Sequence, residues 1–542
     1  MNVLGKLFFF LCLTFTWVLV VFHRVVLPPP QPLPTLERGA LDEGRWYPKR
    51  LYGINQLFVS GSAYTRGVVE GQLTQSLMHD EETQLIGKLN HFFPNPVLRW
   101  GLITGLMRWF WGINAYVDPP ALEEMYGVSH SASAQFNYLL DPYTRQLAYH
   151  GLHEVGQMFV DANQSDKGCT LFAVPVGAGA DRSWVIGRNF DFEGGRIFDE
   201  EKIVKWVRPD KGLRFVSVIW AGMVGAVTGV NEQGVYVSIN AAGSSDFRRF
   251  GTPTTLVVMK ALQFGSDAEA AVKIIEKETT FITDIFVVAD RKKVFRVEKS
   301  PRRFATEELT APTVVTNHLL SPLWHDDPVN ETRRRELTTE SRWARGNGLL
   351  GALGAKPLRT TAEVIPQVLQ FLRDKRDSSG NPLSLGNRMA IDALIASHSV
   401  IYDANRELLY VGEGPSVSGR FIGFDLKASF EGHGPAHVTN RLAADPEVSE
   451  QTYARIKNAD LTIDAAQDRL RKRQCSEAEP LLRTAQEQHR ENYRYFSVLG
   501  DYYACRHQPA EAKQAWKEAL LRSPAYRSER KVLEKKMKET SP

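Results

Sequence analysis

The feature that most constrains this chain is a glycine–cysteine pair in its interior, directly followed by an apolar run. Gly168 and Cys169 precede a β-branched and aromatic segment at 170–176, and Arg188 and Asp191 follow within the next such segment. If the bond between Gly168 and Cys169 is cut, Cys169 carries both a thiol and a free α-amine that can take the thiol proton. The pattern predicts a self-cleaving thiol nucleophile for acyl transfer. A small buried hydrophobic cysteine is the alternative interpretation of the same residue.

Length and composition indicate a globular protein with more than one domain. The chain has 542 residues, of which 43% are apolar and 24% charged, and its net charge of +4 is small for this length. It is too long for one ordinary core, so two or more domains are expected. The sequence has no basic stripe with interleaved aromatics, which argues against a nucleic-acid partner. Four cysteines are too few for a disulfide scaffold, and none lies at zinc-binding spacing, so no metal or other cofactor is expected.

The N-terminus predicts attachment to a membrane. Residues 7–22 are almost wholly apolar, Lys6 and Arg24 flank them, and prolines follow where a small-residue cleavage site would stand. We expect a signal anchor or transmembrane segment at 1–27 and a proline-rich linker at 28–50, with a cleaved signal peptide and a buried helix as alternatives. A short leading segment favours a body on the exported, extracytoplasmic side.

The middle of the chain predicts a helical leading segment followed by an α+β domain. Residues 51–168 have a mostly helical pattern. Residues 169–430 group strands around helical pairs, which indicates sheets covered by helices rather than a βαβ repeat. The expected strands include 170–176, 184–192, 203–207, 215–220 and 235–240.

The C-terminal part, residues 447–540, is hydrophilic and predicts a helical repeat domain. Small and aromatic residues recur there at the spacing of a tetratricopeptide unit: Leu499, Gly500, Tyr503, Ala512, Trp516, Ala519 and Pro524, preceded by Ala466, Ala478, Leu482 and Ala485. We expect two stacked helical hairpins with a capping helix. A plain helical extension is the alternative, and pairing of Cys475 with Cys505 stays open.

Two asparagines at strand ends are candidates for stabilising an oxyanion. Asn240 ends a strand that follows a tight turn, and Asn317 ends another strand. Each can instead be a turn former. His150, His153 and Glu154 lie within one helical turn, but no third metal ligand accompanies the two histidines, so a solvated or core-capping helix face is the preferred interpretation.

Taken in order, these motifs resemble one family of enzymes. The residues that carry the resemblance are Cys169-Thr170, the segment from Gly187 to Asp191, the turn leading to Asn240, Thr316-Asn317 and Ser341-Arg342. They are similar to the N-terminal-nucleophile hydrolases of the isopenicillin N acyltransferase family, which are related to choloylglycine hydrolase and penicillin V acylase. The resemblance covers about residues 50–426.

The resemblance implies a fold and a set of site residues. The fold is a four-layer αββα sandwich, cut between Gly168 and Cys169, to which the N-terminal membrane segment and the C-terminal helical repeats are added. The implied catalytic residues are Cys169 as nucleophile, Arg188 as a cation near the thiol, Asp191 to fix the amine, Asn240 and Asn317 as the oxyanion hole, and Arg342 as a supporting cation. Because a strand does not place 188 and 191 on one face, a bend near Phe190 is expected.

The predicted function is that of an autoproteolytically activated cysteine hydrolase or acyltransferase. It would act on amide or thioester bonds of N-acyl compounds through an acyl-enzyme at Cys169. The expected partners are a small N-acyl or acyl-thioester substrate, the membrane through the N-terminal segment, and a protein bound by the helical repeats. The alternative is a catalytically inert, membrane-anchored scaffold that binds a protein partner through those repeats. Neither the acyl group, the acceptor, nor the choice between hydrolysis and transfer follows from the residues.

Overall fold

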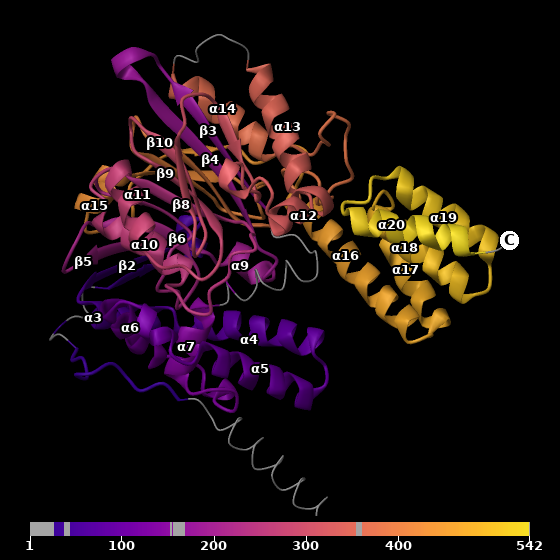
Figure 1. The fold of residues 1–542 in the computed structure, drawn as a ribbon, viewed down its shortest axis with the longest axis horizontal. Helices are drawn as coiled ribbons and strands as arrows, with labels where there is room; N and C mark the ends of the chain where they lie inside the picture. The colour runs from indigo at the N-terminus through magenta and orange to yellow at the C-terminus, as the bar shows by residue number, and fades with distance from the viewer. Residues whose placement is uncertain are drawn as a thin grey trace, which may run out of the picture.

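Two β-sheets packed face to face form the centre of the computed structural model, which describes residues 26–36, 39, 44–151, 154, 168–353 and 360–540 (Figure 1). The larger sheet has the strand order β1-β2-β5-β6-β7-β8-β9-β10-β11, and the smaller has β12-β3-β4-β13-β14-β15-β16. Neighbouring strands run antiparallel, apart from the parallel pair β2 and β5. The predicted α+β class is therefore confirmed.

The strands have the following bounds. The larger sheet contains β1 (Arg45–Tyr47), β2 (Asn55–Gly61), β5 (Ile203–Pro209), β6 (Phe215–Ile219), β7 (Thr228–Asn231), β8 (Tyr236–Ala241), β9 (Asp284–Ala289), β10 (Val294–Lys299) and β11 (Phe304–Glu308). The smaller sheet contains β12 (Thr313–Val315), β3 (Cys169–Val176), β4 (Ser183–Asp191), β13 (Ala396–Asp403), β14 (Leu408–Gly412), β15 (Phe421–Asp425) and β16 (Val438–Leu442).

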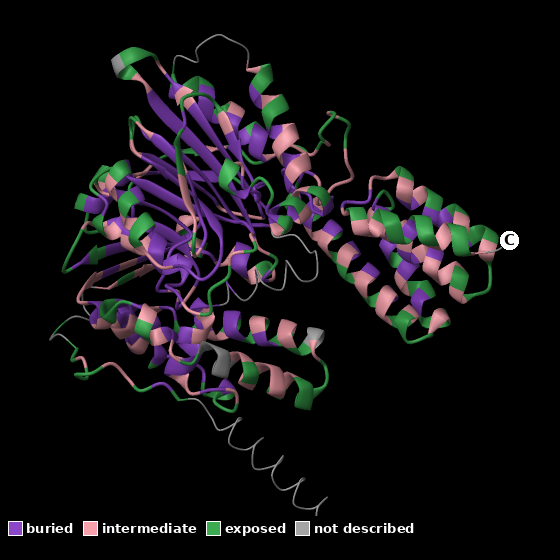
Figure 2. Cartoon of the chain, viewed as in Figure 1, coloured by how far each residue is buried: buried purple, intermediate pink, exposed green. Residues whose placement is uncertain are grey.

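The sheets are buried on both faces because side chains alternate across each strand. On β4, Trp184 and Ile186 enter the core between the sheets, whereas Val185 faces outward. Helices α13 (Thr339–Ala352) and α14 (Thr361–Leu372) cover that outer face, and α10 (Thr254–Phe264) and α11 (Ala268–Lys277) cover the outer face of the larger sheet. The resulting order of layers is helix, sheet, sheet, helix, with the strands buried along most of their length (Figure 2).

The leading segment forms a helical group beside the larger sheet (Figure 1). It comprises α2 (Lys49–Tyr52), α3 (Ala63–Leu73), α4 (Gln75–Phe92), α5 (Pro96–Phe110), α6 (Pro119–Ser129) and α7 (Pro142–His150). Helices α3 and α6 cross closely at Gly67, where an added Cβ would lie 2.0 Å from the Glu124 carbonyl oxygen. Arg66 forms a buried ion pair with Glu124 at 2.6 Å, and Lys205 of β5 lies 3.3 Å from the same carboxylate. Buried ion pairs therefore join the leading segment to the larger sheet.

The predicted membrane anchor, and the exported location inferred from it, are corrected. Among the described residues, no helix is both long enough and apolar enough to cross a bilayer. The apolar run at 7–22, on which the prediction rested, lies outside those residues. Leu27, at the end of the predicted anchor, is buried in a cluster with Met125 of the leading segment, and its backbone N–H donates to Thr144 Oγ1 at 2.9 Å.

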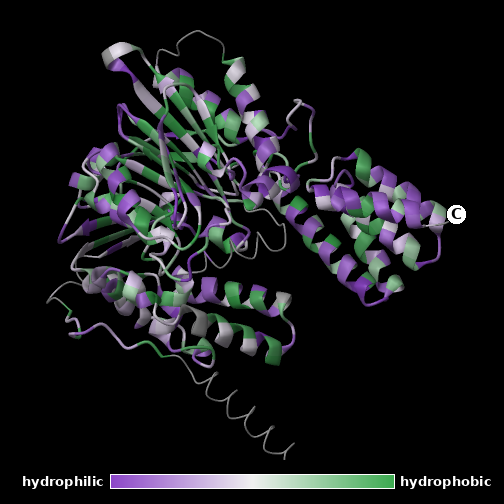
Figure 3. Cartoon of the chain, in the orientation of Figure 1, coloured by the Kyte–Doolittle hydropathy of each residue, from purple (hydrophilic) through white to green (hydrophobic). Residues whose placement is uncertain are grey.

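The C-terminal part is helical, as predicted, and hydrophilic residues predominate along its helices (Figure 3). It consists of α16 (Glu450–Arg471), α17 (Cys475–His489), α18 (Tyr493–Cys505), α19 (Pro509–Leu521) and α20 (Arg527–Glu539). The recurring small residues lie at helix contacts, since Ala466, Ala478, Ala485, Ala512 and Ala519 are all fully buried. The tetratricopeptide assignment and the protein partner stay predictions.

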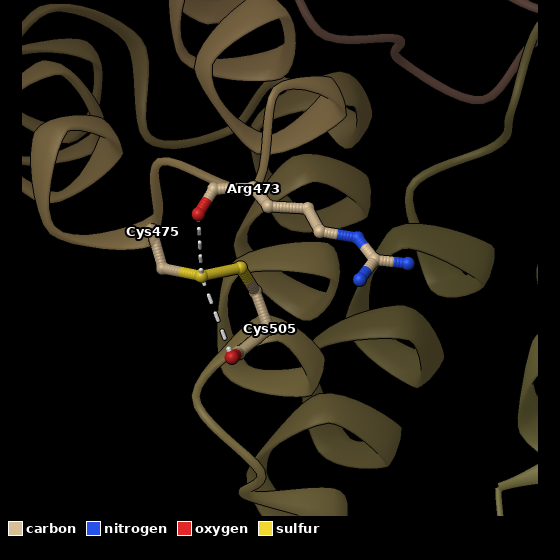
Figure 4. Close-up of a disulfide and its surroundings, with 3 residues drawn as sticks. All are labelled: Arg473, Cys475 and Cys505. Atoms are coloured by element: carbon tan, nitrogen blue, oxygen red, sulfur yellow. Dashed lines mark hydrogen bonds between the residues drawn. A yellow bond between two sulfur atoms is a disulfide. The ribbon is translucent and has the colours of Figure 1, made fainter.

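A disulfide joins two helices of this tail. Cys475, the first residue of α17, pairs with Cys505, the last residue of α18, and their Cα atoms are 6.0 Å apart (Figure 4). Three short helices, α9 (Arg196–Glu200), α12 (Pro328–Glu336) and α15 (Leu426–Glu431), complete the connections of the two sheets. The disulfide settles a pairing that the sequence left open.

Candidate active site

Cys169 begins strand β3, and the neighbouring strand β4 places the other chemistry around it. The register opposes Cys169 to Phe190, so Asp191 lies at the level of Gly168. The Asp191 backbone N–H donates to the Gly168 carbonyl oxygen at 2.9 Å, and a Cβ added to Gly168 would lie 2.7 Å from Asp191 Oδ2. The backbone and carboxylate of Asp191 therefore both lie at the predicted scissile bond.

Arg188 is completely buried and faces the larger sheet. Its Nε donates to Asn240 Oδ1 at 3.2 Å, and its Nη1 donates to the Val227 carbonyl at 3.1 Å. It also bonds to Thr228 Oγ1 and to the Ile239 carbonyl. Strand β4 is continuous up to Asp191, so Arg188 and Asp191, three residues apart, point to opposite faces of the strand. Arg188 points into the space between the sheets, and Asp191 ends the strand beside Gly168. The bend expected near Phe190 is not needed.

Asn317 holds the backbone nitrogen of Cys169. Its Oδ1 accepts a hydrogen bond from the Cys169 N–H at 2.7 Å, while its Nδ2 donates to the Ala241 carbonyl at 2.8 Å. The Asn240 Nδ2 donates to the carbonyls of Thr316 at 3.1 Å and Val315 at 3.3 Å. Both asparagines thus lie in the inter-sheet space at the site, but their amide donors bond to backbone carbonyls.

Arg342 reaches the same point from helix α13. Its Nη1 donates to the Cys169 carbonyl at 2.7 Å and to Thr170 Oγ1 at 2.9 Å, and its Nη2 donates to Asn317 Oδ1 at 2.9 Å. The six predicted site residues therefore gather around the start of β3. They come from both sheets and from one covering helix.

The Cys169 thiol is fully buried, and this burial raises its pKa above the ordinary value. The Arg188 cation lowers that pKa, the Asp191 carboxylate raises it, and Arg342 lowers it again, with burial as the largest influence. A thiol with a raised pKa stays protonated at neutral pH, so it needs a base beside it to act as a nucleophile.

A cavity of about 170 Å³ opens beside the thiol. Cys169, Asp191 and Ala241 form one side of it. The described part of its wall is otherwise mainly apolar, with Leu85, Phe190, Phe192, Phe198, Trp220 and Met223 among the contacts. The sequence gives no sign that these residues lie together, because helix α4, strand β4, helix α9 and the loop at 220–223 are far apart in the chain and meet only when it folds. Such a cavity suits an apolar acyl group.

The histidine pair considered as a metal site is used in other ways. His150 Nδ1 lies 2.7 Å from the Gln146 carbonyl, and His150 Nε2 accepts from the Val224 N–H at 2.9 Å. Burial lowers the pKa of His150 to about 4, so the ring is neutral. Glu154 accepts from the Thr254 N–H at 2.6 Å, and His153 lies outside the described residues. His150 therefore has no ring nitrogen left for a metal.

Comparison with known proteins identifies relatives for part of the chain. Residues 178–353 match the family model of acyl-coenzyme A:6-aminopenicillanic acid acyl-transferase. The 40 kDa form of acyl-coenzyme A:6-aminopenicillanic-acid-acyltransferase from Emericella nidulans is 26% identical over 205 residues, which are 37% of this chain and 52% of that protein. An uncharacterized protein from Archaeoglobus fulgidus is 26% identical over 133 residues, which are 24% of this chain and 22% of that protein. The chain thus spans about half of one relative's length and about a fifth of the other's, and the matches confirm the predicted family resemblance.

Two solved structures match part of this chain with low TM-scores. The Caenorhabditis elegans ortholog of N-acylethanolamine-hydrolyzing acid amidase is 13% identical, with a TM-score of 0.31 over 44% of this chain and 93% of that one. A conjugated bile acid hydrolase from Clostridium perfringens is 12% identical, with a TM-score of 0.32 over 52% of this chain and all of that one.

Proposed function

We propose that the protein is a self-activating cysteine amidase or acyltransferase for N-acyl compounds, in keeping with the match of residues 178–353 to the acyl-coenzyme A:6-aminopenicillanic acid acyl-transferase family model. One observation carries the proposal. Cys169 lies at a strand start with its nitrogen held by Asn317, its preceding carbonyl held by Asp191, and an apolar cavity beside its thiol.

Activation is proposed to begin with the thiol of Cys169. Its sulfur attacks the Gly168 carbonyl carbon, the carbon–nitrogen bond breaks, and the Cys169 nitrogen takes a proton and becomes an amine. Water then hydrolyses the thioester and releases the Gly168 carboxylate. The Asp191 N–H, 2.9 Å from the Gly168 oxygen, supports this step because a donor at that position stabilises the negative charge that develops there.

Turnover would use the same groups after the cut. The new α-amine, held by Asn317 Oδ1, takes the thiol proton, and the sulfur attacks the substrate carbonyl. The leaving amine takes that proton, an acyl-enzyme remains on Cys169, and water or an acceptor amine resolves it. Arg188 and Arg342 favour the thiolate through their positive charges.

The oxyanion would be stabilised by more than the predicted asparagine pair. Once the Gly168 carbonyl has departed, a substrate carbonyl would take its place beside the Asp191 N–H, which also hydrogen-bonds to the Cys169 thiol. Asn240 and Asn317 would each share their amide protons between the oxyanion and the backbone carbonyls to which they now donate. Of these donors, the Asp191 N–H is the one that already bonds to the carbonyl oxygen at the predicted cleavage site.

The test is intact mass measurement and N-terminal sequencing of the purified protein. We expect two chains, one of which begins at Cys169, and turnover of N-acyl amides. The Cys169→Ala variant should stay uncut and inactive, whereas Cys475→Ser, which breaks the disulfide of the tail, should be cut like the wild type. A folded, uncut wild-type chain would eliminate the α-amine as base and favour the inert scaffold.

A further inference from the structure

A carboxyl group with an unpartnered oxygen lies in the wall of the cavity beside Cys169. Glu81, on α4, is 4% exposed and lines the same cavity as the thiol. Its carboxyl hydrogen-bonds to the Ala221 backbone, but Oε1 has no hydrogen-bond partner among the residues that the structure describes. The adjacent Glu82 differs, because Arg145 Nε lies 2.7 Å from Glu82 Oε1. Glu81 Oε1 is therefore a buried polar atom beside the thiol that no described residue hydrogen-bonds.

The charges around the cavity restrict what can make that contact. Of the described residues that line it, none is a lysine or an arginine. Carboxyl groups come from Glu81, Glu82 and Asp191, and the remaining wall is mainly aromatic and aliphatic. An anionic group in this cavity would lose its hydration without gaining a cation. The cavity therefore favours an uncharged, mainly apolar group over an acidic one.

The protonation state of Glu81 decides the kind of hydrogen bond that it offers. Burial raises the pKa of this carboxyl well above its ordinary value. The carboxylates of Glu201, Asp80 and Glu70 raise it further, and the bond from the Ala221 backbone lowers it. The raised pKa favours the protonated carboxyl, whose O–H can donate a hydrogen bond, and an acid proton buried without an acceptor is unfavourable. A ligand that brings an acceptor removes that penalty.

We propose that Glu81 determines acyl specificity by donating a hydrogen bond to a neutral oxygen – a hydroxyl, ether or carbonyl – on the acyl group that fills the cavity. The inference rests on the proposed function and narrows its substrate class. The preferred substrates are amides whose acyl group is long and apolar and carries one uncharged polar oxygen. Acyl groups that end in a carboxylate are excluded.

The experiment uses the full chain and a matched series of N-butyl alkanamides. Their acyl chains have one length and end in methyl, hydroxymethyl, carboxylate or aminomethyl groups. The wild type should prefer hydroxymethyl over methyl by about tenfold in kcat/KM, as one buried hydrogen bond allows. It should disfavour the carboxylate by roughly a hundredfold. An ammonium-terminated compound that surpassed the hydroxymethyl one would overturn the proposal.

Three variants assign the preference to Glu81. Glu81→Leu removes the donor and should erase the preference for hydroxymethyl, whereas Glu81→Gln keeps a donor and should retain most of it. Ser76→Ala changes an exposed side chain on the same helix that does not line the cavity, and it should behave as the wild type. An unchanged preference in Glu81→Leu would overturn the proposal, and the wild-type series is a test even if that variant does not fold.

Calorimetry separates this inference from the proposed reaction. Titration of the same amides into Cys169→Ala, which lacks the proposed nucleophile, measures binding without turnover. If this variant discriminates between the hydroxymethyl and methyl compounds but the wild type turns over neither, the assignment of Glu81 is supported and the proposed reaction is refuted. If the wild type turns over both compounds and neither protein discriminates between them, the proposed reaction is supported and the assignment of Glu81 is refuted.

Discussion

Replacing Arg342 by leucine should loosen the start of strand β3 and impair both cleavage and turnover. Arg342 is 1% exposed, and its guanidinium bonds to the Cys169 carbonyl, to Thr170 Oγ1 and to Asn317 Oδ1. Asn317 Oδ1 is also the acceptor for the Cys169 nitrogen. Removing the guanidinium therefore weakens the group that would hold the catalytic amine.

The size of the effect follows from these contacts. Each of the three hydrogen bonds contributes about 1 kcal/mol net, and buried acceptors left without a donor add to the loss. The leucine side chain fills part of the space and avoids burying a charge, so we expect a net destabilisation of about 3 kcal/mol. Arg342→Lys keeps the charge but loses the planar fork, which should cost about half as much.

Denaturant unfolding followed by tryptophan fluorescence gives the stability, and intact mass gives the cut fraction. Arg345→Leu is the control on the same helix, because Arg345 pairs with Asp374 at 2.7 Å and its described contacts do not include Cys169. It should lower stability without changing the cut fraction. An Arg342→Leu protein with a wild-type unfolding midpoint and complete cleavage would refute the reasoning.

Three further predictions concern other parts of the molecule. The pKa of His150 is lowered from 6.5 to about 4, so its contribution to the free energy of unfolding is present above pH 6.5 and is lost as pH falls through 4. Urea unfolding should show a loss of about 3 kcal/mol from this group over that range. His150→Gln should remove this part of the pH dependence of stability. Reducing the Cys475 disulfide, whose partners are 30 residues apart, should destabilise the tail by about 3–4 kcal/mol in calorimetry without changing kcat; equal loss of kcat would contradict this. Gly67→Ala places a methyl group 2.0 Å from the Glu124 carbonyl oxygen and should cost at least about 3 kcal/mol, whereas Gly87→Ala, with open space around it, should be neutral or stabilising in thermal unfolding.

The central strands were predictable from the sequence because they are buried on both faces. The runs at 170–176, 184–192 and 203–207 became β3, β4 and β5 with end shifts of one or two residues. Such strands are continuously apolar and β-branched, which gives a strong local signal. The edge strands β1 and β11 were not predicted, because an exposed edge carries polar and charged residues that resemble a loop.

The site could be predicted only where its residues share a motif. Cys169, Arg188 and Asp191 were found because two adjacent strands carry them, and the asparagines and Arg342 were found through the family resemblance. Glu81 was not found, since nothing in the spacing relates a residue on α4 to a cysteine on β3. The direction of each asparagine amide also depends on tertiary partners, because the neighbouring donors and carbonyls determine which end faces Cys169.

The buried charges between the leading segment and the larger sheet bear directly on the proposed cleavage. Lys205 of β5 forms ion pairs with Glu70 of α3 and Glu124 of α6. The two carboxylates precede the Gly168–Cys169 bond in the chain and the lysine follows it, so these ion pairs join the two pieces that the cut would produce. After the cut they would keep the two pieces together, and the wild-type pieces should co-elute in size-exclusion chromatography. Lys205→Met leaves two buried carboxylates without that cation, which typically costs 3–5 kcal/mol, and should release the leading piece once the chain is cut. Combining it with Cys169→Ala should restore a single chain, because the covalent link then holds the two parts. A cut Lys205→Met protein that stayed together would show that the other contacts between the pieces are sufficient.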